Sequence, residues 1–301
     1  MTGAKKIIML HGRGRKPEAA QLQELWCQSL AAGLQRDAPE LLDNFAAVPT
    51  QMIYFADELQ QFDRHTFDPK LDLANRQQAL ERLAALDKPR QFRRRSYDEL
   101  PGKTALKEFV MDVSAVAGLS AASTNRALPE LKHYWGDENF KHKVREALLD
   151  TLKQCFANNE DVLLLSHCIG SVVAYDVLWL LGHEHAHSHR VSQWLTFGSP
   201  LGSRYVQGKL QGRKEQGARK YPVNVVEWHN ISAEDDYVCH DKTVADDFVQ
   251  MLEQRLIGGI SDHTIYNLAV RYGRSNPHSS VGYLVHPRTT RCLAEWLSSD
   301  T

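Results

Sequence analysis

Short runs of apolar residues alternate along the chain with longer segments in which apolar residues recur every three or four positions. The short runs predict strands at residues 5–10, 51–55, 161–165, 191–197 and 223–229. The helical spacing predicts helices at residues 75–86, 104–119, 172–181, 243–256 and 289–297, with two more that start near Pro17 and at Asp137. Strands that alternate with helices indicate an α/β fold with a mostly parallel central sheet.

The alternation is interrupted between residues 56 and 135. Two of the predicted helices lie here, and they flank the basic, turn-rich segment 87–95. Roughly 80 residues are too many for an ordinary connection inside a compact domain. We therefore predict a single domain over residues 1–301, with a helical cap or lid inserted at 56–135.

The composition changes this picture little, but it excludes several classes of protein. The 301 residues include 36 Lys and Arg against 37 Asp and Glu, and this balance argues against a nucleic-acid binder. No apolar run approaches the ~18 residues of a membrane helix, so we expect no integral membrane segment. The five cysteines, at positions 27, 155, 168, 239 and 292, show no CxxC spacing. They predict reduced thiols in a cytoplasmic protein rather than a disulfide or zinc framework.

A strand, a tight turn and a helix follow one another around Cys168. The turn is residues 166–170, SHCIG. This order is typical of a nucleophile elbow, in which the residues two before and two after the nucleophile must be small, as Ser166 and Gly170 are. A helix N-terminus and a nearby imidazolium lower the pKa of a cysteine, so Cys168 is a candidate nucleophile. The alternative is a small buried core residue.

The chain resembles the α/β-hydrolase superfamily, in its lipase- and esterase-like branch, nearly throughout except for the insertion. His11-Gly12 resembles the family's oxyanion loop, residues 166–170 resemble its G-x-S-x-G motif, and residues 196–202 (TFGSPLG) resemble a strand end of lipase-like members. Ser166 replaces the first glycine of the motif. Cys168 replaces the serine, as in dienelactone hydrolases and polyhydroxyalkanoate synthases.

The resemblance implies a three-layer α/β/α sandwich and an active site without cofactor or metal. It also implies an oxyanion hole made of two backbone N–H groups. One belongs to Ile169, directly after the nucleophile, and the other to Arg13 in the loop that follows the first strand.

The family order of nucleophile, acid and base points to an acid just beyond the strand predicted at 223–229. Asp236 stands there in the sequence Asp-Tyr-Val, where family members often have Asp-Pro-Val. Asp235 is the alternative acid. Both could also be ordinary turn residues, because aspartate is common in turns.

The base is expected in a loop before the C-terminal helix. Residues 276–284 (NPHSSVGYL) resemble the family's histidine loop and point to His278, with His286 as the competitor. His278 would take the thiol proton and later activate water, while Asp236 would orient its imidazole.

Other features carry weaker signals. The histidine-rich segment 183–189 invites a metal site, but it is predicted at the far edge of the sheet, so adventitious binding is the favoured interpretation. Cys239, close to Asp236, is a possible second reactive thiol. Four arginines of the insertion could meet phosphates or an acidic substrate if the insertion covers the site, or could form a solvated loop. These are Arg90, Arg93, Arg94 and Arg95.

We therefore expect a hydrolase that cleaves a small-molecule ester, lactone or thioester through an acyl-thioester on Cys168. Acyl transfer from the same acyl-enzyme is the alternative within enzymes. A non-catalytic or redox-sensing protein of the same fold is the alternative from another class, because a low-pKa thiol that is exposed also oxidises readily. The sequence leaves the identity of the substrate and the oligomeric state open.

Overall fold

The computed structural model describes residues 3–62, 68–102, 128–236, 238–239 and 241–299. Six strands form one sheet in the order β2-β1-β3-β4-β5-β6, and every neighbouring pair is parallel. The strands are β1 (Lys5–Leu10), β2 (Thr50–Ile53), β3 (Asp161–His167), β4 (Val191–Phe197), β5 (Val225–Ala233) and β6 (Gly259–Ile265). Two short strands, β7 (Val270–Arg271) and β8 (Arg274–Ser275), form a separate antiparallel pair. The predicted α/β class with a mostly parallel sheet is confirmed.

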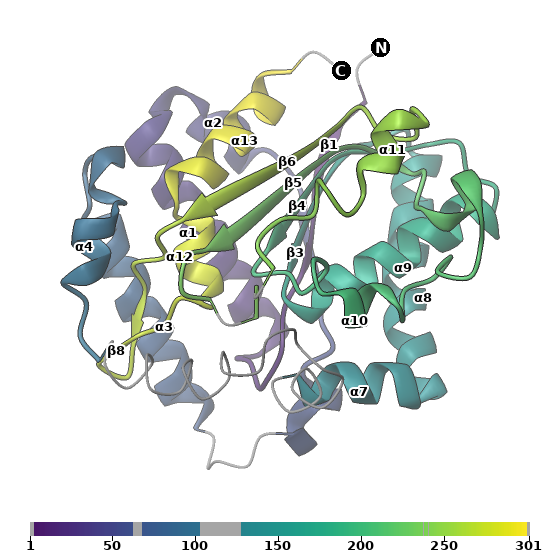
Figure 1. The fold of residues 1–301 in the computed structure, drawn as a ribbon. Coiled ribbons are helices and arrows are strands. Elements are labelled where there is room, and N and C mark those ends of the chain that lie inside the picture. Colours follow the sequence, from purple (N-terminus) through teal and green to yellow (C-terminus); the bar gives the residue numbers. More distant parts are fainter. Residues whose placement is uncertain (1–2, 63–67, 103–127, 237, 240, 300–301) are drawn as a thin grey trace.

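Helices cover both faces of this sheet (Figure 1). Successive side chains of a strand point to opposite faces. Ile8 and Leu10 of β1 accordingly join one hydrophobic cluster with α8 and α9, whereas Ile7 and Met9 join another with α1 and α13. The main helices are α1 (Ala19–Asp37), α3 (Pro69–Ala84), α8 (Glu138–Ala157), α9 (Ile169–His183) and α13 (Pro287–Ser298). Shorter helices are α2 (Leu42–Ala46), α4 (Arg94–Asp98), α7 (Pro129–Gly136), α10 (Arg204–Gln207), α11 (Val249–Glu253) and α12 (Ser280–Leu284).

The described parts of the inserted segment pack against helices on both sides of the sheet. Helix α3 packs against α1 and α12, and α7 packs against α8. Helix α3 begins earlier than the predicted residue 75, because the side chain of Asp68 caps it and Pro69 occupies its first turn. The helix predicted at 104–119 lies outside the described residues. That the insertion acts as a cap stays a prediction.

Two sequence predictions fail where tertiary contacts decide the backbone conformation. The helix predicted at 243–256 shrinks to α11, because the backbone N–H groups of Val244 and Ala245 donate to the carboxylate of Asp262 instead of entering a helix. Strand β6, which carries Asp262, was not predicted. Most of its residues are polar or small and only partly buried, so its apolar pattern is weak.

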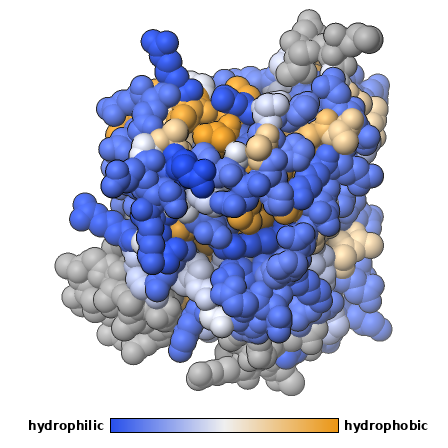
Figure 2. Space-filling view, turned by 90° about the vertical axis from the view of Figure 1, so that its right-hand side faces the viewer, coloured by the Kyte–Doolittle hydropathy of each residue, from blue (hydrophilic) through white to orange (hydrophobic). Residues whose placement is uncertain are grey.

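In the part of the chain that the structure describes, no helix is both long and apolar enough to cross a membrane. The face drawn in Figure 2 is mostly hydrophilic, and hydrophobic side chains come to the surface only in limited areas. The large hydrophobic side chains with the greatest exposure among the described residues are Leu71, Val226, Val249 and Tyr272.

Truncating the stacked tryptophans inside the sheet region should cost much stability. Trp228 of β5 is fully buried and stacks on Trp194 of β4 with ring centroids 4.6 Å apart. We expect Trp228→Ala to lower the free energy of unfolding by about 3–5 kcal/mol in urea denaturation. Val226→Ala, on the same strand but 39% exposed, should change it by less than about 1 kcal/mol. Equal losses for the two variants would contradict this packing.

Candidate functional site

Cys168 occupies a strained turn between β3 and α9. Its φ of 55° and ψ of −124° lie in a region that costs a non-glycine residue about 1–3 kcal/mol. The Cys168 N–H donates to the carbonyl oxygen of Phe197 at the end of β4 (2.9 Å), which fixes the turn to the sheet. A Cβ at Gly170 would lie 2.7 Å from the carbonyl oxygen of His11, so glycine is required there. Strand, strained turn, glycine and helix are all present, and Cys168 itself is completely buried.

The loop after β1 lies directly against this turn. A Cβ at Gly12 would stand 2.7 Å from the Cβ of Cys168 and 2.4 Å from Nδ1 of His167. His11 anchors the loop: its Nε2 accepts the N–H of Phe55 (2.9 Å), so its Nδ1 carries the proton and donates to the carbonyl oxygen of Gly12 (2.8 Å). Burial lowers the pKa of His11 to about 3, which keeps it neutral in this role. Arg13 follows Gly12 and is thereby brought beside the turn.

His278 and Asp236 form a buried ion pair. Nδ1 of His278 lies 2.8 Å from Oδ2 of Asp236. The same carboxylate accepts the hydroxyl of Tyr283 (2.7 Å) and the N–H of Val238 (3.0 Å), so its position is fixed on both oxygens. The imidazole of His278 also interacts with Cys168 through a side-chain hydrogen bond. The structure therefore brings together the three side chains that the sequence predicts as nucleophile, base and acid.

The charges in the site keep a proton on His278. Burial lowers the pKa of this imidazole, but the negative charges of Asp236 and Cys168 and the hydrogen bonds to both outweigh burial and raise the pKa to about 10. His278 is therefore an imidazolium at neutral pH. Because its pKa is higher in the folded than in the unfolded protein, its contribution to stability is complete below about pH 6.5 and is lost as the pH rises through about 10.

Two residues that the sequence analysis missed hold this pair in place. Gly198 has a φ of +53°, and a Cβ there would stand 2.9 Å from Oδ2 of Asp236 and 3.0 Å from Nδ1 of His278. Asn267 donates from Nδ2 to the carbonyl oxygens on either side of His278, those of Pro277 (3.0 Å) and Ser279 (2.9 Å). Gly198 stood in the TFGSPLG motif and could have been singled out, whereas Asn267 carries no signal in the sequence.

The structure places the alternative acid and base elsewhere. Asp235 accepts the hydroxyl of Tyr97 and does not face His278. His286 caps α13 by accepting the N–H of Arg288 (3.1 Å), and burial together with the charge of Arg36 lowers its pKa to about 3. Both residues have structural partners of their own.

The remaining candidates lie outside the pair. Cys239 is buried beside Tyr283, and burial together with Asp236 raises the pKa of its thiol well above the usual value, so it is protonated. The histidine-rich segment follows α9 at the end opposite Cys168. Arg94 and Arg95 are exposed and pair with Asp98 and Glu99 along α4.

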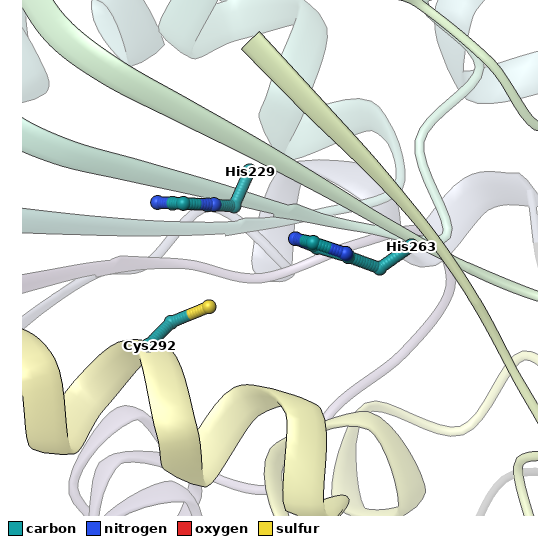
Figure 3. Close-up of side chains that lie close together, drawn as sticks. All are labelled: His229, His263 and Cys292. Atoms are coloured by element: carbon teal, nitrogen blue, oxygen red, sulfur yellow. The ribbon is translucent and has the colours of Figure 1, made fainter. Parts of the chain in front are cut away.

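A second cluster of metal-binding side chains lies between β5, β6 and α13. The nitrogen and sulfur ligand atoms of His229, His263 and Cys292 all lie within 4.8 Å of one another (Figure 3). These atoms are of the kind that bind zinc. Burial and the charge of Arg288 lower the pKa of His263 to about 4, however, and burial raises that of Cys292 to about 12. Burial therefore holds the Cys292 sulfur as a thiol, whereas zinc binds the thiolate, so we base no function on this cluster.

Removing the carboxylate of Asp236 should release the proton from His278. In Asp236→Asn, the pKa of His278 should fall from about 10 toward the ordinary histidine range, measured by NMR titration of the imidazole C–H signals. Asp235→Asn is the matched control. Because Asp235 bonds to Tyr97, its loss should leave that titration unchanged. If Asp235→Asn produced the larger shift, the pairing described above would be wrong.

No protein-family model matches this chain, and no curated protein matches it.

Proposed function

We propose that this protein is a hydrolase of the α/β-hydrolase type that cleaves an ester, lactone or thioester with a Cys168–His278–Asp236 triad. The observation that carries the proposal is a thiol in a strained strand–helix turn, next to an imidazolium that is paired with a buried carboxylate. Strain of this kind persists at functional sites, where the surrounding structure holds it.

The fold supports the same proposal. Helices on both faces of the parallel sheet fit a three-layer α/β/α sandwich. The three side chains stand after β3, after β5 and before α12, in the chain order nucleophile, acid, base. In open α/β sheets, sites form at the carboxyl ends of the strands, where Cys168 and Asp236 are found.

The proposed reaction proceeds through a thioester. The Cys168 sulfur attacks the acyl carbonyl carbon, the carbonyl π-bond electrons move to oxygen, and their return expels the alcohol or thiol, which takes a proton from His278. Neutral His278 then removes a proton from water as the water attacks the thioester. Collapse of the second intermediate breaks the C–S bond and releases the carboxylic acid. Asp236 holds the imidazole in the required tautomer throughout.

Two backbone N–H groups are proposed to bind the oxyanion. Ile169 is the first residue of α9, where N–H groups are unpaired within the helix and the dipole favours negative charge. The carbonyl of Gly12 is directed toward His11, and the trans peptide turns the N–H of Arg13 the opposite way. Loss of one such donor typically lowers the rate about 10²–10³-fold.

Acyl transfer is the alternative activity. It uses the same acyl-enzyme and differs only in the acceptor, which is a thiol or alcohol in place of water. A redox-sensing protein of the same fold is the alternative from another class, because an activated thiol also oxidises readily.

A chromogenic ester tests the nucleophile. We expect p-nitrophenyl acetate to give a burst of p-nitrophenol and an acetyl adduct on Cys168, detected by mass spectrometry of the quenched protein. Cys168→Ala should lose both, whereas Cys27→Ala, which changes a half-buried thiol on α1, should keep both. Acylation of Cys168→Ala at the wild-type rate would refute the proposal.

Alkylation of the thiol tests the base independently of turnover. His278→Ala should slow the reaction of Cys168 with iodoacetamide at pH 7 by at least about tenfold, because the imidazolium no longer stabilises the thiolate. The matched control is His286→Asn, which keeps a capping side chain at the start of α13 and should react at the wild-type rate. Unchanged kinetics in His278→Ala would remove this residue from the triad.

A further inference from the structure

A pocket of about 230 Å³ opens beside the triad. His278 and His167, the residue before Cys168, form one side of it. Its other described lining side chains are mainly cationic, and none of them is Asp or Glu. The cations are Arg13, Arg15, Lys16, Arg76 and Arg271.

These cations come from three separate parts of the chain. Arg13, Arg15 and Lys16 follow β1, Arg76 is on α3, and Arg271 is on β7. Local sequence therefore does not explain why they gather on one pocket. A surface charge run, such as that on α4, has its opposite charges beside it on the same helix.

The structure fixes these side chains in place. Asp72, which is fully buried, pairs with both Arg76 (Nε–Oδ2 2.7 Å) and Arg271, and accepts the hydroxyl of Tyr272 (3.3 Å). Nζ of Lys16 donates to the carbonyl oxygens of Arg13 and Gly14. Burying such charges is costly unless they are compensated.

The basic groups of the pocket repel one another. Asp72 serves two guanidinium groups, and Glu130 lies 3.6 Å from Arg13. Burial and the charges of Arg76 and Arg271 hold the pKa of Lys16 well below its usual value, and the charge of Cys168 acts in the opposite direction. The positive charge thus lies close enough to the thiol to interact with it, and an anion in the pocket would relieve the repulsion.

We propose that this pocket binds an anionic group of the substrate, a carboxylate or a phosphate, while the acyl carbon lies at Cys168. The inference rests on the proposed function for the acyl group, but the anion site itself does not require turnover. Guanidinium groups suit either anion, because their paired N–H donors match carboxylate and phosphate oxygens. The protein's substrate is then an acyl compound with a negative charge near the bond that is cleaved.

Two alkylating agents of nearly equal size test the anion site without any hydrolysis. Iodoacetate carries a carboxylate where iodoacetamide carries a neutral amide, and both react with a thiolate by releasing iodide. For each thiol we divide the rate with iodoacetate by the rate with iodoacetamide. This ratio should be at least about tenfold higher for Cys168 than for glutathione. It should fall in 0.5 M NaCl, because screening weakens partly exposed charges.

Variants locate the effect. Arg271→Gln and, separately, Arg15→Gln should lower the iodoacetate preference several-fold while leaving the iodoacetamide rate within about twofold. Arg94→Gln, on the exposed face of α4, is the control and should change neither rate. Circular dichroism and thermal unfolding establish that each variant is folded. The proposal would be overturned if the wild-type protein preferred iodoacetate no more than glutathione does. It would also be overturned if the folded pocket variants kept the full preference for iodoacetate.

Paired substrates then distinguish the two anions. Mono-p-nitrophenyl succinate against p-nitrophenyl butyrate measures the effect of a carboxylate. S-acetyl-2-mercaptoethyl phosphate against S-acetyl-2-mercaptoethanol measures that of a phosphate. A higher kcat/KM for one charged member, lost in Arg271→Gln, identifies the anion. If no acyl compound is cleaved but the iodoacetate preference holds, the proposed hydrolysis fails and the anion site stands. If the esters are cleaved without any charge preference in either assay, the anion site fails and the hydrolysis stands.

Discussion

The close approach of three backbone segments around Cys168 is the constraint on which the rest of the site depends. The loops after β1, β3 and β4 meet where Gly12, Gly170 and Gly198 leave room for the elbow and for the His278–Asp236 pair. A methyl group at Gly12 would collide with the side chains of His167 and Cys168. One at Gly170 would collide with the backbone of the loop after β1, and one at Gly198 with the His278–Asp236 pair. The buried parallel strands hold the loops at that spacing, and they sustain a cysteine conformation that an isolated turn would not adopt.

Burial alone does not decide whether a histidine in this site is charged. The side chains that contact its imidazole decide it. His11 and His167 are buried like His278, and burial lowers the pKa of both. His278 has a carboxylate and a thiol within reach, and its pKa moves in the opposite direction. The three neighbouring imidazoles therefore divide into two neutral hydrogen-bonding groups and one cation. This difference places a proton on the imidazole that lies between the Asp236 carboxylate and the Cys168 thiol.

The parts of the structure that the sequence predicted well are those determined by residues close together in the chain. The elbow is contiguous, so its strand, turn and helix are visible in the residues around Cys168. The choice between Asp236 and Asp235 needed the tertiary structure, because only the side-chain directions separate neighbours. The helix predicted from residue 243 failed because a carboxylate from β6 takes its N–H groups. The cationic pocket was not predicted, since α3 and the β7–β8 pair reach it from distant parts of the chain.

Asp72 connects two parts of the molecule that lie far apart in the sequence. It lies on α3, within the inserted segment, where it pairs with Arg76 of the same helix, and through Arg271 it reaches the β7–β8 pair that precedes the His278 loop. Two of the basic residues proposed to select the substrate, Arg76 and Arg271, thus lie on segments other than those that carry Cys168 and Asp236. If the proposed function holds, substitutions in α3 and in the hairpin would change which acyl compounds are accepted while the thiol, imidazole and carboxylate stay unchanged. Selectivity could then diverge by exchange of peripheral segments.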